Sequence, residues 1–455
     1  MSADVQPDGL PPRARFWACV AMWLALIMAV VDSSIANVAL PTIAKDLHTQ
    51  AAASIWVVNA YQLAIVVALL PLATLGEIIT FRRVFLAGLL LFVLASIGCC
   101  FAGSLAELTF ARAVQGLGAA GVMAVNPALV RFTYPAAQLG RGVGFNALVI
   151  SVAAVIGPSL ASLILAHASW PWLFAVNVPT GVAALAVGLF ALPQNPRAAG
   201  RLDRLSTCLN VIAYGGTVLG LDMLIRGGAI LSGAAILGIG IAAGWLLVRR
   251  SLPQTRPLIP IDLLRNRLFA LSVATSFASF IAQTLAFLSV PFLLQLIMHR
   301  TQVETGLLIT AWPLATGVAA PFAGRLADRY PAALLGGIGL GLFGAGLALL
   351  ATMPADAPAV AIVWRLALCG LGFGVFQPPN NRTMLSAAPR ERTGAAGGML
   401  ATARLSGQTA GATLAAILLG LSTKGLVWSL WLGAAVAMVG ALISLSRLRL
   451  SPPPR

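Results

Sequence analysis

Long apolar stretches recur along the whole chain and restrict what it can fold into. A helix needs about 20 apolar residues to cross a bilayer, and the sequence contains fourteen such stretches. Only 9% of the 455 residues are charged, whereas soluble globular chains carry about 25%. The sequence therefore predicts an all-α integral membrane protein. We place its fourteen spans at 16–40, 52–75, 84–103, 105–130, 142–166, 170–192, 205–225, 228–248, 268–297, 303–325, 332–352, 358–381, 393–421 and 425–446.

The basic residues support this count and orient the chain. With a cytosolic N-terminus, the cytosolic loops and tails hold 22 of the 29 Lys and Arg residues, the outer loops hold four, and three lie within spans. Cytoplasmic loops of membrane proteins carry such an excess, and an error of one span would destroy it. We expect a multi-pass protein of the plasma (cell inner) membrane with both termini cytoplasmic. The net charge of +16 belongs to these loops, so we expect no nucleic-acid partner.

The two halves of the chain contain similar segments. GLGAAGVMAVNP begins at Gly116, and GLGFGVFQPPNN begins at Gly370, 254 residues later. Glu77 and Asp328, which follow the second and tenth spans, are 251 residues apart. Parallel repeats of this kind are a transporter architecture in which the substrate binds between the halves near the bilayer midplane. We predict a six-helix bundle, an inserted pair formed by helices seven and eight, and a second six-helix bundle, at 1–194, 195–255 and 256–455.

Two opposite charges lie at matching depths in spans one and four. Asp32 precedes the outer end of its span, Leu40, by eight residues, and Arg112 follows the start of its span, Leu105, by seven. At 1.5 Å per residue, both lie about 10–12 Å from the outer helix ends. An unpaired charge at this depth is costly, so we expect the two to pair. The pair is either a proton switch or a static link between helices. We favour the switch, because membrane-embedded acids are usually functional.

Arg404 is a further charge within a predicted span, eleven residues from its start. It either binds an anionic group or acts as a fixed counter-charge that helps eject a proton. Polar side chains in the spans are candidates for substrate binding, and hydrogen bonding between helices is the alternative role of each. These are Asn37, Asn59, Tyr61, Gln62, Gln115, Asn146, Gln283, Gln377, Asn380 and Asn381, together with Arg404.

Patterns typical of catalytic or metal sites are missing from the sequence. The three histidines lie in separate predicted loops, and the five cysteines form no C-x-x-C pair. Residues 116–121 fit the dinucleotide pattern G-x-G-x-x-G, but that motif must follow a strand. Within a span, glycines instead let helices approach closely. We therefore expect no cofactor, no metal and no enzymatic activity.

Two of these segments resemble motifs of a known family. DSSIANVALP at 32–41 resembles the first-helix motif of the fourteen-span drug:proton antiporters in the major facilitator superfamily. RAVQGLG at 112–118 resembles their fourth-helix motif, whose arginine is implicated in proton coupling. The resemblance extends over the whole chain, including the inserted pair of helices. It implies the major facilitator fold and a proton-coupling role for Asp32 and Arg112.

Two further segments strengthen the resemblance. IGP at 156–158 resembles the antiporter motif, which implies that Gly157 and Pro158 let helices bend and pack between the half-transporters. WPWLFAVNVP at 170–179 is similar to the beginning of the family's sixth helix. These motifs follow one another in the expected order and in the expected spans.

The loop after the second span departs from the family pattern G-x-L-A-D-R-x-G-R-R. Here the chain reads ATLGEIITFRR at 73–83, so that Glu77 replaces the aspartate and both glycines are missing. The resemblance implies an inner gate built from charge pairs. We expect it to persist with Glu77, Arg82 and Arg83, and with Asp328 in the second repeat.

The resemblance implies a proton-coupled antiporter that exports lipophilic, chiefly cationic drugs, dyes and biocides from the cytosol by alternating access. Its partners would be small-molecule substrates, protons and the lipid bilayer, and we expect it to work as a monomer. Some relatives carry additional acids in spans ten and thirteen. This sequence has Arg404 there instead, which weighs against the recognition of dications. The alternative is a proton-coupled exporter of one endogenous metabolite or lipid.

Overall fold

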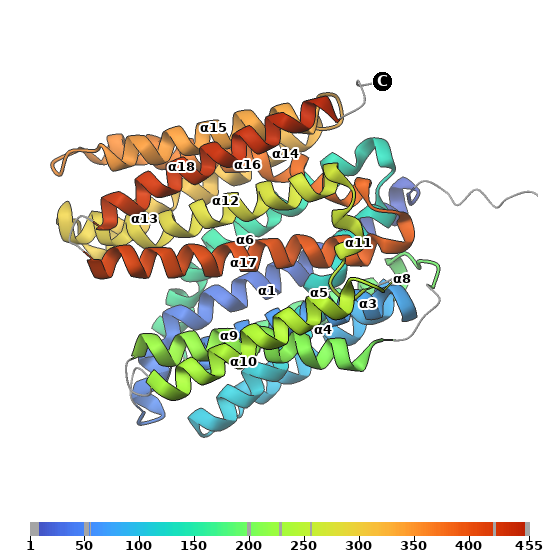
Figure 1. The fold of residues 1–455 in the computed structure, drawn as a ribbon. Coiled ribbons are helices and arrows are strands. Elements are labelled where there is room, and N and C mark those ends of the chain that lie inside the picture. Colours follow the sequence, from blue (N-terminus) through green and yellow to red (C-terminus); the bar gives the residue numbers. More distant parts are fainter. Residues whose placement is uncertain are drawn as a thin grey trace, which may run out of the picture. The chain divides into compact units, whose positions relative to one another are not determined.

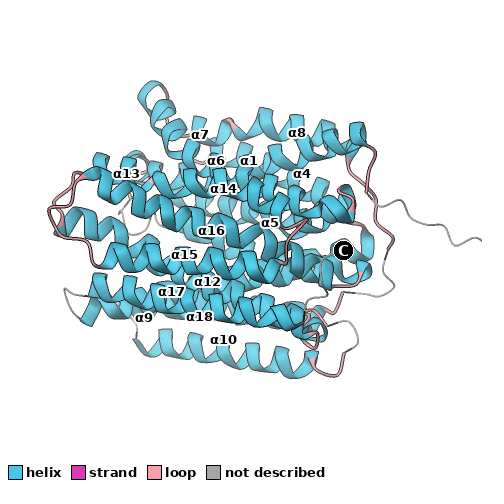
Figure 2. Ribbon diagram, turned by 90° about the horizontal axis from the view of Figure 1, so that it is seen from above, coloured by secondary structure: helices cyan, strands magenta, loops and turns pink. Residues whose placement is uncertain are grey.

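The structure is a computed structural model that describes residues 9–49, 54, 56–197, 202–226, 230–254, 257–421 and 425–450. All regular secondary structure within these ranges is helical (Figure 2). In a bilayer, backbone groups cannot hydrogen-bond to water, and a helix satisfies them within one segment. The apolar stretches therefore form helices, as predicted.

Among the described residues, twelve helices are long and apolar enough to cross a membrane. This count confirms a multi-pass chain but does not reach the predicted fourteen. The two predicted spans outside the count correspond to α9 (Arg204–Arg226) and α17 (Thr393–Leu421), which contain 23 and 29 residues. Both are long enough to cross.

The helices group into two compact units. The first contains Met1–Tyr134, Ile156–Arg265 and Pro389–Met399. In sequence order (Figure 1), its helices include α1 (Pro12–Asp46), α3 (Trp56–Ile79), α4 (Phe81–Cys100), α5 (Leu105–Thr133), α7 (Trp172–Ala175), α8 (Asn177–Ala191), α9, α10 (Ile230–Ser251), α11 (Ile261–Leu264) and η3 (Arg390–Arg392).

Glycines on α5 bring its backbone against two neighbouring helices of the first unit. A Cβ atom on Gly118 would lie 2.5 Å from the backbone nitrogen of Phe92 on α4. A Cβ on Gly116 would collide with the carbonyl oxygen of Tyr61 on α3. The glycines of this motif therefore serve helix packing. They draw α3, α4 and α5 together at the level of Arg112.

The second unit contains Pro135–Val155, Asn266–Ala388 and Leu400–Arg455. Trp312, Phe343 and Phe373 stack edge to face in its core. Its elements include η1 (Ala136–Gln138), α12 (Arg267–Phe292), the π-helical η2 (Leu293–Ile297), α13 (Gln302–Ile309), α14 (Ala311–Leu326), α15 (Ala332–Ala351), α16 (Ala359–Ala387), α18 (Gly425–Ser446) and η4 (Arg447–Arg449).

Close packing around the glycines recurs in the second unit. A Cβ on Gly372 of α16 would lie 2.5 Å from the backbone nitrogen of Phe343 on α15. Gly372 is 254 residues after Gly118, and Phe343 is 251 residues after Phe92. The sequence repeat is therefore also a repeat of helix–helix packing.

Two long helices contribute to both units. Residues 139–155 of α6 (Leu139–His167) group with the second unit, and the remainder of this helix groups with the first. In α17, residues 393–399 group with the first unit and the remainder with the second. The division at 194/195 and 255/256 stays a prediction.

Candidate functional site

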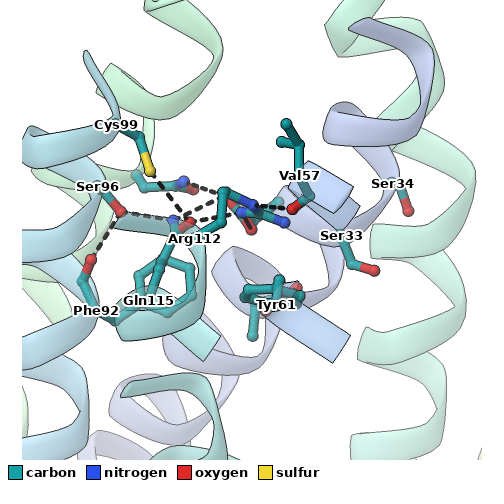
Figure 3. Close-up of polar contacts among 12 residues, drawn as sticks. Ser33, Ser34, Val57, Tyr61, Phe92, Ser96, Cys99, Arg112 and Gln115 are labelled. Carbon is teal, nitrogen blue, oxygen red and sulfur yellow. Dashed lines mark hydrogen bonds and ion pairs between the residues drawn. The ribbon is translucent and has the colours of Figure 1, made fainter. Parts of the chain in front are cut away.

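A buried ion pair lies in the first unit, between α1 and α5. Arg112 Nη1 is 2.5 Å from Asp32 Oδ2, and the two side chains are 0% and 1% exposed. Figure 3 shows the Arg112 side chain at the centre of a network of polar contacts. The structure thus brings together the two charges whose depths match in the sequence.

Two side-chain amides hold the other oxygen of the Asp32 carboxylate. Gln115 Nε2 donates to Asp32 Oδ1 at 2.9 Å, and Asn177 Nδ2 donates to the same atom at 2.7 Å. Gln115 lies one turn after Arg112 on α5, and Asn177 is the first residue of α8. An ionised carboxylate only accepts hydrogen bonds. Both oxygens of the Asp32 carboxylate therefore have donors.

The Arg112 guanidinium is held from several sides. Its Nε donates to the carbonyl oxygen of Val57 at 3.1 Å, and its Nη1 also donates to Gln115 Oε1 at 2.5 Å. The guanidinium carbon lies 4.1 Å from the ring centre of Tyr61 and 5.5 Å from that of Phe174. Both distances allow cation–π attraction. Nη2 is buried and has no hydrogen-bond acceptor within the described part of the chain.

Side chains of α4 fix the orientation of the Gln115 amide. Gln115 Nε2 donates to Ser96 Oγ at 2.8 Å, and Ser96 in turn donates to the carbonyl oxygen of Phe92 at 2.8 Å. The Cys99 thiol lies 3.7 Å from Gln115 Oε1 (Figure 3). The amide therefore presents its nitrogen to Asp32 and its oxygen to Arg112.

The ion pair also links two helices. Asp32 lies on α1 and Arg112 lies on α5, so their contact holds these helices together. Removing one partner of a buried pair costs about 3–5 kcal/mol, because an uncompensated charge remains. The contact between α1 and α5 therefore depends on both charges.

A second buried acid of the first unit lies at the end of α3. Glu77 Oε1 accepts a hydrogen bond from the backbone nitrogen of Ala395 at 2.7 Å, and Oε2 is 3.5 Å from Arg392 Nη1. Arg392 also pairs with Asp262 at 2.9 Å. Of the predicted basic partners, Arg82 donates to the carbonyl oxygen of Leu189, and the Arg83 side chain is exposed.

Asp328 occupies the corresponding place in the second unit, after α14. Its Oδ1 accepts a hydrogen bond from the backbone nitrogen of Gly140 at 3.2 Å and lies 3.5 Å from Arg382 Nε. Arg141 Nε is 3.9 Å from Oδ2. Burial raises the pKa of Asp328 above its ordinary value, although Arg382 lowers it. Within each unit, the acid thus accepts a hydrogen bond from the first turn of a long helix, α17 for Glu77 and α6 for Asp328.

A family model described as "Major Facilitator Superfamily" matches residues 22–206 and 271–455, one segment in each half of the chain. The chain belongs to the major facilitator superfamily. Its members are typically carriers rather than enzymes, and the chain is a membrane transporter. The two matched segments agree with the repeat and leave out most of α9 and all of α10.

Several curated proteins resemble the chain along most of their length. The uncharacterized transporter YebQ of Escherichia coli K12 is 47% identical over 99% of this chain and 98% of its own length. The riboflavin transporter RibZ of Clostridioides difficile is 28% identical over 86% and 85%. The multidrug resistance protein Stp of Mycobacterium tuberculosis is 32% identical over 93% and 78%. The crystal structure of the human organic anion transporter MFSD10 shares the fold, with a TM-score of 0.70, 14% identity and coverage of 96% of this chain and 100% of that one.

Of the predicted substrate-binding residues in the first unit, two belong to the ion-pair site. Tyr61 and Gln115 are buried beside Arg112. Gln62 is exposed, with its Nε2 3.5 Å from Ser33 Oγ. The side chain of Asn37 lies outside what the structure describes.

The antiporter motif lies on α6 at a close contact with α1. A Cβ on Gly157 would lie 2.6 Å from the Cβ of Ser34, so glycine is needed for this approach. Ser34 is two residues from Asp32, and a change at the contact would therefore reach the ion pair through α1. The side chain of Pro158 is outside the described part of the structure.

The candidates of the second unit differ in their surroundings. Asn380 is buried and donates to the carbonyl oxygen of Ser272 at 3.1 Å and to Ser276 Oγ at 2.8 Å. Its Oδ1 accepts a hydrogen bond from Arg447 at 2.7 Å. Its amide is therefore engaged in packing between helices. The remaining candidates are partly buried: Asn146, Gln377, Asn381 and Arg404.

Sequence reasoning missed the contributions of Asn177 and Ser96 to the site. Asn177 stands in the WPWLFAVNVP segment, where it attracts attention only as part of a motif. Its polar side chain at the start of an apolar helix was the available signal. The partner of Glu77 was also missed, because Arg392 is 315 residues away in the sequence.

Proposed function

We propose that this transporter is a proton-coupled antiporter that exports lipophilic, chiefly cationic compounds from the cytosol by alternating access. The observation that carries the proposal is the buried Asp32–Arg112 pair with its two amide donors. Among the relatives, Stp is a multidrug resistance protein, which supports the substrate class.

The proposed cycle uses the ion pair as a switch between two states. In one state Asp32 is ionised and the helices are held as the structure shows. In the other, Asp32 carries a proton, and Arg112 is released from it. A cationic substrate and a proton would then exclude each other at the Asp32–Arg112 site, because both change the charge that balances Arg112. This competition produces antiport.

We propose that α9 and α17 also cross the membrane, which gives fourteen spans and places both termini in the cytosol. α9 lies beside α10 (Figure 1), and a Cβ on Gly216 would lie 3.0 Å from the Cα of Gly240. α10 is among the twelve apolar helices, and a helix of 23 residues is about 34 Å long. A helix of this length that packs along a spanning helix is expected to span as well. The excess of basic residues in the predicted cytosolic loops supports the same orientation.

The test is flux driven by an imposed pH gradient in liposomes that contain the purified protein. A panel of cationic, neutral and anionic compounds would be compared for wild type, Asp32→Asn and Asp46→Asn. Asp46 is an exposed acid on the same helix, so its variant controls for the lost carboxylate. We expect Asp32→Asn to lose proton-driven flux and Asp46→Asn to retain it. Proton exchange that persists in Asp32→Asn would contradict the proposal.

A second candidate is the export of one endogenous metabolite or lipid, coupled to protons. It is favoured by the likeness to the riboflavin transporter RibZ and by Arg404, a cation in α17 that suits an anionic group better than a cationic one. In the same assay, pH-driven flux of anionic or neutral compounds without any flux of cations would favour it. Loss of that flux in Arg404→Ala would assign Arg404 to the substrate, whereas unchanged affinity with altered pH dependence would assign it to proton release.

A further inference from the structure

An open apolar groove lies on the first unit between α3, α5 and α9. It has a volume of about 1160 Å³. One wall is the face of α3 from Trp56 to Val67, the second is the face of α5 from Leu105 to Leu117, and the third is α9 from Val211 to Leu219. None of the three walls comes from the second unit.

The walls of the groove are apolar. None of the seventeen lining residues is charged, and Thr109 carries the only hydroxyl group among them. Exposed side chains such as Phe110 and Ile212 line the groove from opposite walls. Buried polar groups need hydrogen-bond partners, and these walls offer almost none. The groove therefore suits a hydrocarbon ligand and excludes a charged or polar one.

The length of the groove matches one leaflet of a bilayer. The eleven helical steps from Trp56 to Val67 rise about 16 Å along α3, which is about half of the 30 Å hydrocarbon core. The groove begins where α3 begins, and tryptophan is enriched at such membrane interfaces. At the other end, Asn210 Nδ2 on α9 donates to the carbonyl oxygen of Val67 at 2.8 Å, which joins the two helices there.

From these dimensions and this chemistry, we propose that the groove binds one acyl chain of a membrane phospholipid. The chain enters from the leaflet at the Trp56 end and stops near the Asn210–Val67 hydrogen bond. The positive-inside pattern assigns this end to the outer leaflet. An apolar opening between membrane helices is filled by the apolar molecules that surround it, and the acyl chain is the one present at this depth.

The position of the groove gives the acyl chain a structural consequence. Thr109 and Ala113, which line the groove, flank Arg112 on α5, and Trp56 precedes Val57, whose carbonyl oxygen holds the Arg112 guanidinium. The groove thus borders the same segments of α3 and α5 that hold Arg112. An empty space would deprive these helices of dispersion contacts on one side. The bound chain therefore supports the wall that carries the ion pair.

A glycine that lines the groove makes the proposal testable. A Cβ on Gly215 of α9 would meet nothing within 4 Å, so the side chain of Gly215→Leu starts in open space at the groove. Gly238 on α10 also has open space around a Cβ and does not line the groove. Gly238→Leu is therefore the matched control. Ala106→Leu on α5 blocks the groove from a second wall if the glycine variant fails to fold.

The probe is a phosphatidylethanolamine with a photoactivatable diazirine in one acyl chain, mixed into liposomes that contain the full-length protein. After irradiation, cross-linked peptides are mapped by mass spectrometry. We expect cross-links within 105–117 and 211–219 in wild type and in Gly238→Leu, and their loss in Gly215→Leu and Ala106→Leu. Unchanged cross-linking in both groove variants overturns the proposal. So does displacement of the lipid by a lipophilic cation at low concentration, which would make the groove a substrate site. The readout needs no transport, so its failure is distinct from failure of the antiport proposal.

Discussion

Replacing Asn177 with leucine tests how much one amide donor contributes to the stability of the buried Asp32 site. Asn177 Nδ2 is 2.7 Å from Asp32 Oδ1, and the side chain is 2% exposed. Leucine has a similar size and no donor. The substitution removes one of the three side-chain hydrogen bonds to the carboxylate and leaves those of Arg112 and Gln115 in place.

The size of the effect follows from the charge of the acceptor. A hydrogen bond to a charged group is worth about 1.5–3 kcal/mol. Asn177→Leu should therefore lower the free energy of unfolding by about that amount.

The loss is measured as the fall in melting temperature of the purified protein relative to wild type. Thr180→Val is the control on the same helix, because the Thr180 hydroxyl donates to the carbonyl oxygen of Val176, just before α8. We expect Asn177→Leu to melt at a clearly lower temperature than Thr180→Val. Equal melting temperatures of the two variants refute the reasoning.

Three further predictions concern the packing and charges around the site. Gly118→Leu should lower the melting temperature strongly, because overpacking costs about 1–3 kcal/mol or more and the atoms next to Gly118 include backbone atoms. The control is Gly341→Leu, where a Cβ meets open space, and this variant should melt like wild type. Arg392→Ala should lower the free energy of unfolding by about 1.5–3 kcal/mol, because buried Glu77 and partly exposed Asp262 both lose their ion pair with Arg392. Exposed Arg83→Ala should have no such effect, and equal melting curves would argue against these ion pairs. Although partial burial raises it, hydrogen bonds hold the pKa of Asp203 well below its ordinary value. Asp203→Asn should therefore speed hydrogen exchange in the first turn of α9 at neutral pH. The difference from wild type should vanish in strong acid, where the wild-type carboxylate also loses its charge. A difference that persists in strong acid would contradict the role of this charge.

The Asp32–Arg112 contact was accessible from the sequence because helix geometry is fixed. Each residue of a helix advances the chain by 1.5 Å, so counting from the span ends gives the depth of each charge. The cost of an unpaired charge in the bilayer then requires charges of equal depth to meet. The packing role of Gly118 followed in the same way, once the segment was placed within a span.

Other contacts lay beyond this reasoning. Depth does not give the rotation of a helix about its axis, and rotation decides that Asn177 faces Asp32 while Gln62 is exposed. One partner of Glu77 is Arg392, which lies in η3, between α16 and α17 in the sequence. Long arginine side chains reach several positions, so the sequence offered Arg82 and Arg83 as equally suitable neighbours.

The sequence by itself determined that the chain is a helical membrane protein with an internal repeat, and it predicted an ion pair between spans one and four. Hydropathy and helix rise depend on position along the chain, and the cost of a buried charge depends on its depth along the membrane normal. All three can therefore be evaluated from the sequence. Only the tertiary structure decided which amides complete the Asp32 site and where α9 leaves an apolar groove beside α3 and α5. Those features depend on helix rotation and lateral packing, which are set by many weak contacts at once.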